Sequence, residues 1–209
     1  MFEPLFIFSL ILLFQNIAVF LDNLGVYNLI QKHQNSKIAS NYAKKYQIDF
    51  LSRGFLFFTP PLLGFLLIQN NLSLILSCFL ASSLVSLLVT LIQSFFFVRQ
   101  REIKYILDRS FKNTIYICLG CIVFFIHLYV PFYLNIIGHF SLENSLWIVQ
   151  LSPALTSLST AFIVYYLDPT IAKYIDSKKN TNIILEMVLM RILGRILIVL
   201  SALILFIYF

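Results

Sequence analysis

Charged side chains are scarce in this chain. They make up 11% of its 209 residues, whereas hydrophobic residues make up 60%, and the mean hydropathy is +0.89. This composition lies far outside the range of soluble globular proteins. We therefore expect an integral membrane protein.

Glycine is also scarce, and the motifs of several enzyme classes are missing. The sequence has six glycines and contains no G-x-S-x-G nucleophile elbow, no H-E-x-x-H zinc motif and no phosphate-binding glycine loop. These absences argue against an ATP-driven pump on this chain, and we expect neither an enzyme nor a bound cofactor. We also find no aromatic and basic motif of the kind that recognises nucleic acid.

The three cysteines do not form a metal-binding pattern. Cys118 and Cys121 make a C-x-x-C within an apolar stretch, but no second Cys or His pair lies at the spacing of a metal site. Free cysteine behaves as a small hydrophobic residue. We interpret these two residues and Cys78 as packing residues and expect no metal site.

The apolar residues form runs of about 20 residues, the length that crosses a hydrocarbon core of about 30 Å. The runs are continuous rather than alternating, which favours helices over a β-barrel. We expect an all-α integral membrane protein whose single domain covers residues 1–209, with about six spans at 4–26, 50–69, 72–98, 114–139, 144–167 and 184–209. The first span has no basic n-region and no clear cleavage site, so we expect it to remain as an anchor.

The basic residues are distributed on one side of this predicted topology. All Lys and Arg residues other than Arg191 and Arg195 follow spans 1, 3 or 5, and the loops near Asn70 and Gly138 contain none. The positive-inside rule then predicts cytoplasmic basic loops and both termini outside. The formal net charge of +6 indicates binding to anionic membrane lipids rather than to nucleic acid.

Two of the basic segments are amphipathic. Residues 36–47 and 99–113 each place apolar side chains on one face and most of their charges on the other. The apolar residues are Ile38, Tyr42 and Tyr46 in the first segment and Ile103, Ile106, Leu107 and Phe111 in the second. We expect interfacial helices in loops 1-2 and 3-4, which either anchor the chain to headgroups or sense a lipid substrate.

The last span carries two arginines. Arg191 and Arg195 are four residues apart and therefore share one helix face. An arginine at the centre of a span costs about 2.5–3.5 kcal/mol, so both side chains need a polar cavity or a carboxylate inside the bundle. Asp22 near the end of span 1, and Asp168 at the end of span 5, are candidate carboxylates.

These polar groups have two interpretations. The carboxylates either neutralise Arg53, Arg191 and Arg195 and hold helices together, or they belong to a substrate site. Asp22, Asp168 and His127, in the middle of span 4, are also candidates for proton coupling, although a hydrogen bond to a neighbouring helix would explain His127 equally well.

Prolines mark two candidate hinges. Pro60 and Pro61 remove backbone donors in the middle of span 2 and predict a kink there. Pro169 follows Asp168 and should end or bend span 5. Each kink is either a structural feature or the broken helix of a transporter.

Four segments, in order along the chain, carry a resemblance to a known family: LDNLGVYN, SRGFLFFTPPLLG, STAFIVYYLDPTIAKYIDS and MVLMRILGRILI. Together they resemble the polar motifs of the Amj family of bacterial lipid II flippases. That family has an aspartate ending its first span, an arginine before a proline-leucine-glycine stretch, an Asp-Pro closing a late span and an Arg-x-Leu-Gly stretch in the last. The matching positions here are Asp22, Arg53, residues 61–64, Asp168, Pro169, Arg191 and Gly194.

The resemblance implies a function and a location. Such a protein moves lipid II, the undecaprenyl-pyrophosphate-linked precursor of peptidoglycan, from the inner to the outer leaflet of the bacterial cytoplasmic membrane and so serves cell-wall synthesis and cell shape. We expect the polyprenyl-linked headgroup to be bound by Arg53, Arg191, Arg195, Asp22 and Asp168. Guanidinium groups suit this task because they bind phosphate oxygens in pairs and keep their charge.

Other functions fit the same composition. A small-solute transporter or a substrate-binding membrane subunit would also have about six spans in a chain of 24.3 kDa. A purely structural membrane partner would use the charged residues only as salt bridges. Homo-oligomers are compatible with all of these functions.

Overall fold

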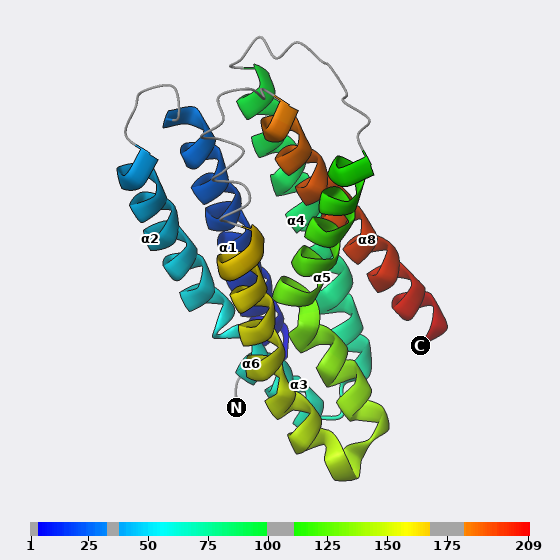
Figure 1. The fold of residues 1–209 in the computed structure, drawn as a ribbon. Coiled ribbons are helices and arrows are strands. Elements are labelled where there is room, and N and C mark those ends of the chain that lie inside the picture. Colours follow the sequence, from blue (N-terminus) through cyan, green and yellow to red (C-terminus); the bar gives the residue numbers. More distant parts are fainter. Residues whose placement is uncertain (1–3, 33–37, 100–110, 168–181) are drawn as a thin grey trace.

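The computed structural model describes residues 4–32, 38–99, 111–167 and 182–209, and every element in these ranges is helical (Figure 1). An all-α fold was the prediction. The elements are α1 (Pro4–Lys32), α2 (Ile38–Leu56), α3 (Thr59–Ile68), α4 (Leu72–Arg99), α5 (Phe111–Phe140), the 3-10 turn η2 (Leu142–Asn144), α6 (Ser145–Phe162), the π-helical turn η3 (Ile163–Leu167) and α8 (Asn182–Tyr208).

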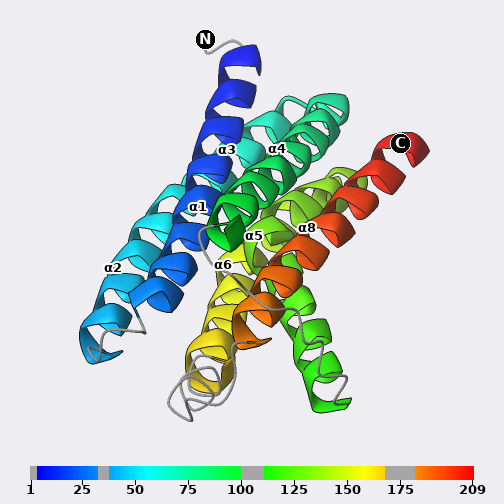
Figure 2. The ribbon, with the colours of Figure 1, turned by 90° about the horizontal axis from the view of Figure 1, so that it is seen from above.

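The helices form an elongated bundle in which α1, α4, α5 and α8 surround the centre (Figures 1 and 2). Helix α1 packs along α2 and α4, while α8 packs against α4 and α5. Helix α6 lies mainly on α5, and the short α3 contacts α5, α1 and α4. Segments far apart in the chain, from α1 and α8, thus face a shared interior.

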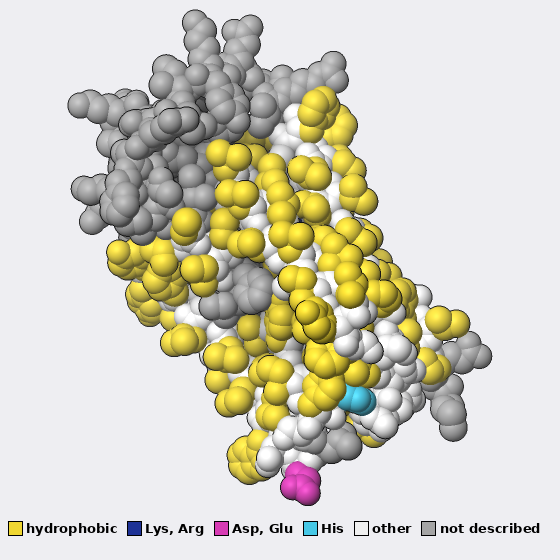
Figure 3. All heavy atoms as spheres, turned by 90° about the vertical axis from the view of Figure 1, so that its right-hand side faces the viewer, with side chains coloured by type: hydrophobic (Ala, Val, Ile, Leu, Met, Phe, Trp, Pro, Cys, Tyr) yellow, Lys and Arg dark blue, Asp and Glu magenta, His cyan; other side chains and the backbone are white. Residues whose placement is uncertain are grey.

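Apolar side chains cover much of the surface of the bundle, and polar side chains are buried inside it beside an apolar core. Large apolar side chains such as Phe57, Ile68 and Trp147 are 74–84% exposed, whereas Gln15 and Asn23 are fully buried. One face of the molecule is covered with hydrophobic side chains over most of its described length (Figure 3). Apolar side chains outside and polar ones inside are the arrangement that a surrounding hydrocarbon solvent favours.

Four stretches of the described chain are long and apolar enough to cross a membrane, judged by length and composition. They are Pro4–Tyr27, Lys44–Ile68, Leu72–Phe97 and Met187–Tyr208. These coincide with the first, second, third and sixth predicted spans. The fourth and fifth predicted spans are helical as expected, as α5 and as α6 with η3, but whether they cross a membrane stays a prediction.

The loop after span 1 differs from the prediction. We expected a separate interfacial helix here. Residues 38–47 are helical, but they form the first half of α2, which continues without a break to Leu56. A helix already propagating needs no second nucleation, and no proline or glycine interrupts residues 38–53. The second interfacial segment lies almost entirely outside the described residues.

The predicted kink in span 2 is confirmed. Helix α2 ends at Leu56, a turn covers Phe57 and Phe58, and α3 begins at Thr59. Pro60 and Pro61 therefore lie in the first turn of α3, where backbone N–H groups have no partner within the helix. The first bond of α3 runs from the N–H of Leu62 to the carbonyl of Phe58, at 3.5 Å. The prolines thus remove only N–H groups that would have no partner within α3.

Two helices approach closely at a glycine. A Cβ atom added to Gly120 on α5 would lie 2.3 Å from the Sδ atom of Met190 on α8. The thiol of Cys121 also lies 3.5 Å from the carbonyl oxygen of Met190. Small residues at such contacts let membrane helices pack backbone to backbone.

We predict that Gly120→Ala destabilises the protein by about 1–3 kcal/mol, because the added methyl group overlaps the buried Met190 side chain. Unfolding in detergent, followed by circular dichroism, measures this effect. Gly64→Ala is the matched control, since no atom lies within 4 Å of its added Cβ. Adding Met190→Ala should recover part of the loss, and equal losses for Gly120→Ala and Gly64→Ala would contradict the contact.

Candidate functional site

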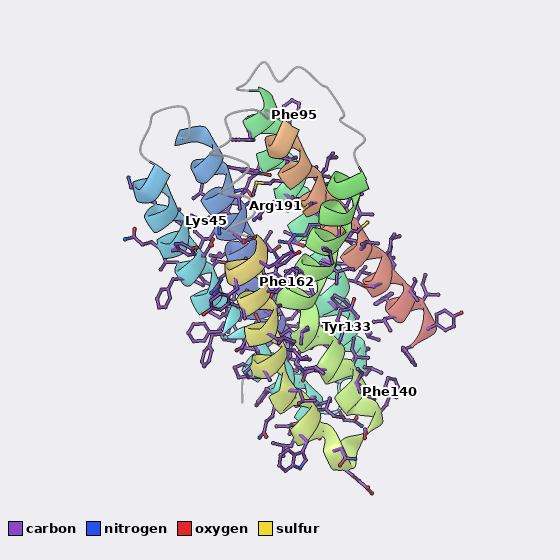
Figure 4. All side chains as sticks on the ribbon, viewed as in Figure 1. Lys45, Phe95, Tyr133, Phe140, Phe162 and Arg191 are labelled. Carbon is purple, nitrogen blue, oxygen red and sulfur yellow. The ribbon has the colours of Figure 1, made fainter. Side chains whose placement is uncertain are left out.

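An ion pair joins the first and last helices inside the bundle. The Nη1 atom of Arg191 on α8 lies 2.5 Å from the Oδ2 atom of Asp22 on α1. The Arg191 side chain is 4% exposed and the Asp22 side chain 21%. Figure 4 shows Arg191 in the interior between these helices. A spanning helix that carries a permanent charge is thus attached to its counter-charge 169 residues earlier in the chain.

Arg195 lies one turn deeper along the same face of α8. Its Nη2 atom is 4.0 Å from the same Asp22 oxygen, and its side chain is only 1% exposed. Tyr129 of α5 lies beside this guanidinium group. The expectation that Arg195 faces a carboxylate inside the protein is therefore confirmed, and both arginines converge on one oxygen atom.

Asn23 extends this cluster to a third helix. Its Oδ1 atom accepts a hydrogen bond of 2.7 Å from Arg191, while its amide nitrogen donates to the Thr90 hydroxyl at 3.1 Å and to the Gln93 side chain at 2.8 Å. Gln93 in turn donates to the Phe20 carbonyl. Because these bonds are buried, they hold α1, α4 and α8 in one register.

Helix α4 presents a row of buried hydroxyl groups to this interior. The row consists of Ser82, Ser86, Thr90 and Ser94, which recur every fourth residue and are at most 3% exposed. Ser86 shares a hydrogen bond of 2.6 Å with the Tyr129 hydroxyl, and Ser94 shares one of 2.6 Å with Tyr27. The sequence analysis missed this row, although its spacing of four marks one helix face.

A further polar contact reaches the break between α2 and α3. The Thr59 hydroxyl, at the start of α3, donates to the Gln15 side-chain oxygen at 3.3 Å, and the Gln15 amide donates to the Leu128 carbonyl at 2.8 Å. Gln15 and Thr59 are both fully buried. The proline-marked break therefore faces the polar interior and not only lipid.

The other predicted site residues lie apart from this cluster or outside the described part. Arg53 is half-buried on α2 and makes no ion pair among the described residues. Asp22, the candidate carboxylate for Arg53, pairs with Arg191 and Arg195 instead. Asp168 and Pro169 lie outside the described residues. His127 belongs to α5, but its side chain is outside the description, so Asp22 is the only proton-coupling candidate with a described environment.

One buried ion pair was not predicted. Lys45 and Asp49 on α2 are joined by a bond of 2.9 Å and are 5% and 9% exposed (Figure 4 labels Lys45). A Cβ atom on Gly25 of α1 would lie 2.9 Å from the Asp49 carboxylate, so a larger residue there would have to displace that carboxylate. The i, i+4 spacing of opposite charges on one helix was the available sequence signal.

The described side chains contain no group of three His, Cys, Asp or Glu residues that could hold a metal ion. No family model, no curated protein and no solved structure matches this chain. A functional assignment therefore depends on the geometry and chemistry of the residues described above.

We predict that Asp22→Asn destabilises the protein by about 3–5 kcal/mol, because it removes the negative charge that two buried guanidinium groups face. Chemical unfolding in detergent measures the change. The double variant Asp22→Asn, Arg191→Met should be less destabilised than the sum of its single changes by about 1–3 kcal/mol. Glu143→Gln, at an exposed carboxylate, should change stability by less than about 0.5 kcal/mol, and additive single changes would contradict the pairing.

Proposed function

We propose that this protein is a flippase for a polyprenyl-linked lipid with a phosphate-bearing headgroup, and that lipid II is its substrate. One observation carries the proposal: two arginines on one face of α8 converge on a single carboxylate inside an apolar bundle. The resemblance of the chain's polar segments to lipid II flippases supports the choice of substrate.

The chemistry of the cluster supports exchange between two anions. Guanidinium groups keep their charge in a protein and bind carboxylates and phosphates through the same paired N–H donors. Asp22 then acts as the resident counter-ion of Arg191 and Arg195 when no substrate is bound. A pyrophosphate group that enters the cluster replaces the carboxylate, so the arginines are countered in both states.

The surface of the bundle suits a lipid substrate. A polyprenyl chain can stay in the bilayer against the exposed apolar side chains while its headgroup passes between helices. In this proposal the protein lies in the bacterial cytoplasmic membrane with six spans, both termini outside and its basic loops on the cytoplasmic side, where anionic lipids attract them. Asp22 and Arg191 then lie nearer the cytoplasmic ends of α1 and α8.

We predict that Arg191→Gln and Arg195→Gln each slow translocation by at least about tenfold, the effect of losing one hydrogen bond between charged groups. The measurement is the transfer of fluorescent lipid II between leaflets of vesicles that contain the purified protein. Arg191→Lys should retain part of the rate, because it keeps the charge but loses the planar fork. Lys44→Gln, at an exposed cation on α2, is the matched control and should leave the rate unchanged.

The same assay separates the alternatives. If the double variant Asp22→Leu, Arg191→Met folds, inserts and still translocates lipid II at the normal rate, the cluster is only a structural salt bridge. Saturable binding of a water-soluble molecule to vesicles without lipid II, combined with no lipid transfer, would replace the flippase by a small-solute transporter.

A further inference from the structure

We infer that Arg195, Tyr129 and Gln15 form a second binding site for a phosphate-bearing anion, one helical turn deeper than Arg191, which we call the station. A cluster of aromatic rings closes the station on the side away from Arg191. This inference rests on the proposed function and extends it from one site to two. It names Tyr129 and Gln15, which the sequence analysis did not single out.

The three side chains come from three helices and meet in the interior. Arg195 is 1% exposed, and Tyr129 and Gln15 are fully buried. Tyr129 lies next to both Gln15 and Arg195, and its hydroxyl shares a hydrogen bond of 2.6 Å with Ser86 of α4. Guanidinium, hydroxyl and amide groups all donate hydrogen bonds to phosphate oxygens. In the structure the Gln15 amide donates to the Leu128 carbonyl and the Tyr129 hydroxyl to the Ser82 carbonyl, so an entering anion would exchange with these carbonyl oxygens.

The position of the station along the bundle suits a stepwise path. Arg195 follows Arg191 by four residues, about 6 Å along α8. On the facing helix α4, Thr90 binds Asn23 at the level of Arg191, and Ser86 binds Tyr129 at the level of Arg195. A headgroup that leaves Arg191 therefore finds the next guanidinium and the next hydroxyl one turn further on.

Beyond Tyr129 lies a cluster of buried aromatic rings. The Tyr129 ring lies 5.7 Å from each of the rings of Phe79 and Phe132, and these two rings stack at 5.1 Å. All three side chains are fully buried. The Tyr129 hydroxyl thus lines the station, and the Tyr129 ring belongs to the aromatic cluster that closes the station. An anion in the station has no polar contact among these rings until they move apart.

The test is thiol labelling in vesicles. In a protein carrying Cys78→Ala, Cys118→Ala and Cys121→Ala, we introduce Ser86→Cys and apply a membrane-impermeant anionic thiol reagent from each side in turn. We expect labelling from the side of the Asp22 end only, and labelling from both sides after Phe132→Ala. Leu88→Cys, exposed on the lipid-facing side of α4, should stay unlabelled and Gln69→Cys, exposed at a helix end, should react.

Protection identifies the ligand and its source. Undecaprenyl pyrophosphate in the vesicles, or inorganic pyrophosphate in the buffer, should slow labelling of Ser86→Cys by about tenfold. Protection by the inorganic ion alone would support the station and overturn the lipid flippase. If Ser86→Cys is labelled from neither side, or if neither compound slows its labelling, the station is overturned. The lipid-transfer assay decides the proposed function independently.

A conservative substitution checks the role of the hydroxyl group. Tyr129→Phe keeps the ring packing and removes the hydroxyl, so we expect a loss of stability of about 1 kcal/mol, loss of most pyrophosphate protection and about tenfold slower lipid transfer. Tyr133→Phe is the matched control, because Tyr133 also carries a hydrogen-bonded hydroxyl, to Ser201, outside the station. Equal effects of the two substitutions would show that only packing is involved.

Discussion

The interior of this bundle is organised by the need to counter two guanidinium groups inside an apolar protein. Neither arginine can lose its charge under ordinary conditions, and neither lies at a helix end where its side chain could extend into water. Asp22 therefore links α8 to α1 across the interior of the bundle. Asn23, next in the chain, connects the same ion pair to α4 and so places the row of buried hydroxyl groups beside the arginines.

This arrangement connects stability to function. A surface salt bridge contributes little, but a buried one is costly to break unless another partner replaces the one removed. A phosphate group can replace a carboxylate with little change in geometry, whereas a neutral solute cannot. In the function we propose, an anionic headgroup would exchange with the contacts that link α1 to α8, and Asp22 would couple helix packing to headgroup binding.

Much of the fold could be predicted because lipid imposes simple rules. Apolar runs of sufficient length predicted the helices, and two adjacent prolines predicted the break before α3. The site was predicted less completely. The spacing of four placed Arg191 and Arg195 on one face, but nothing local distinguished Asp22 from Asp168 as their partner. Tyr129, Gln15 and Asn23 were not identified, because an isolated polar residue in an apolar run has the same sequence pattern whether it faces a neighbouring helix or a site.

The sequence by itself determined the helical class of the protein, the approximate limits of its helices and the requirement that two arginines be countered inside. These properties depend on the hydrophobicity, charge and backbone restrictions of residues close together in the chain. Only the tertiary structure decided that Asp22 pairs with both arginines, that α4 turns its hydroxyl groups toward α5 and α1, and that rings from α4 and α5 pack beside Tyr129. Those contacts join residues dozens to more than a hundred positions apart, and their formation depends on how the helices rotate and pack against one another.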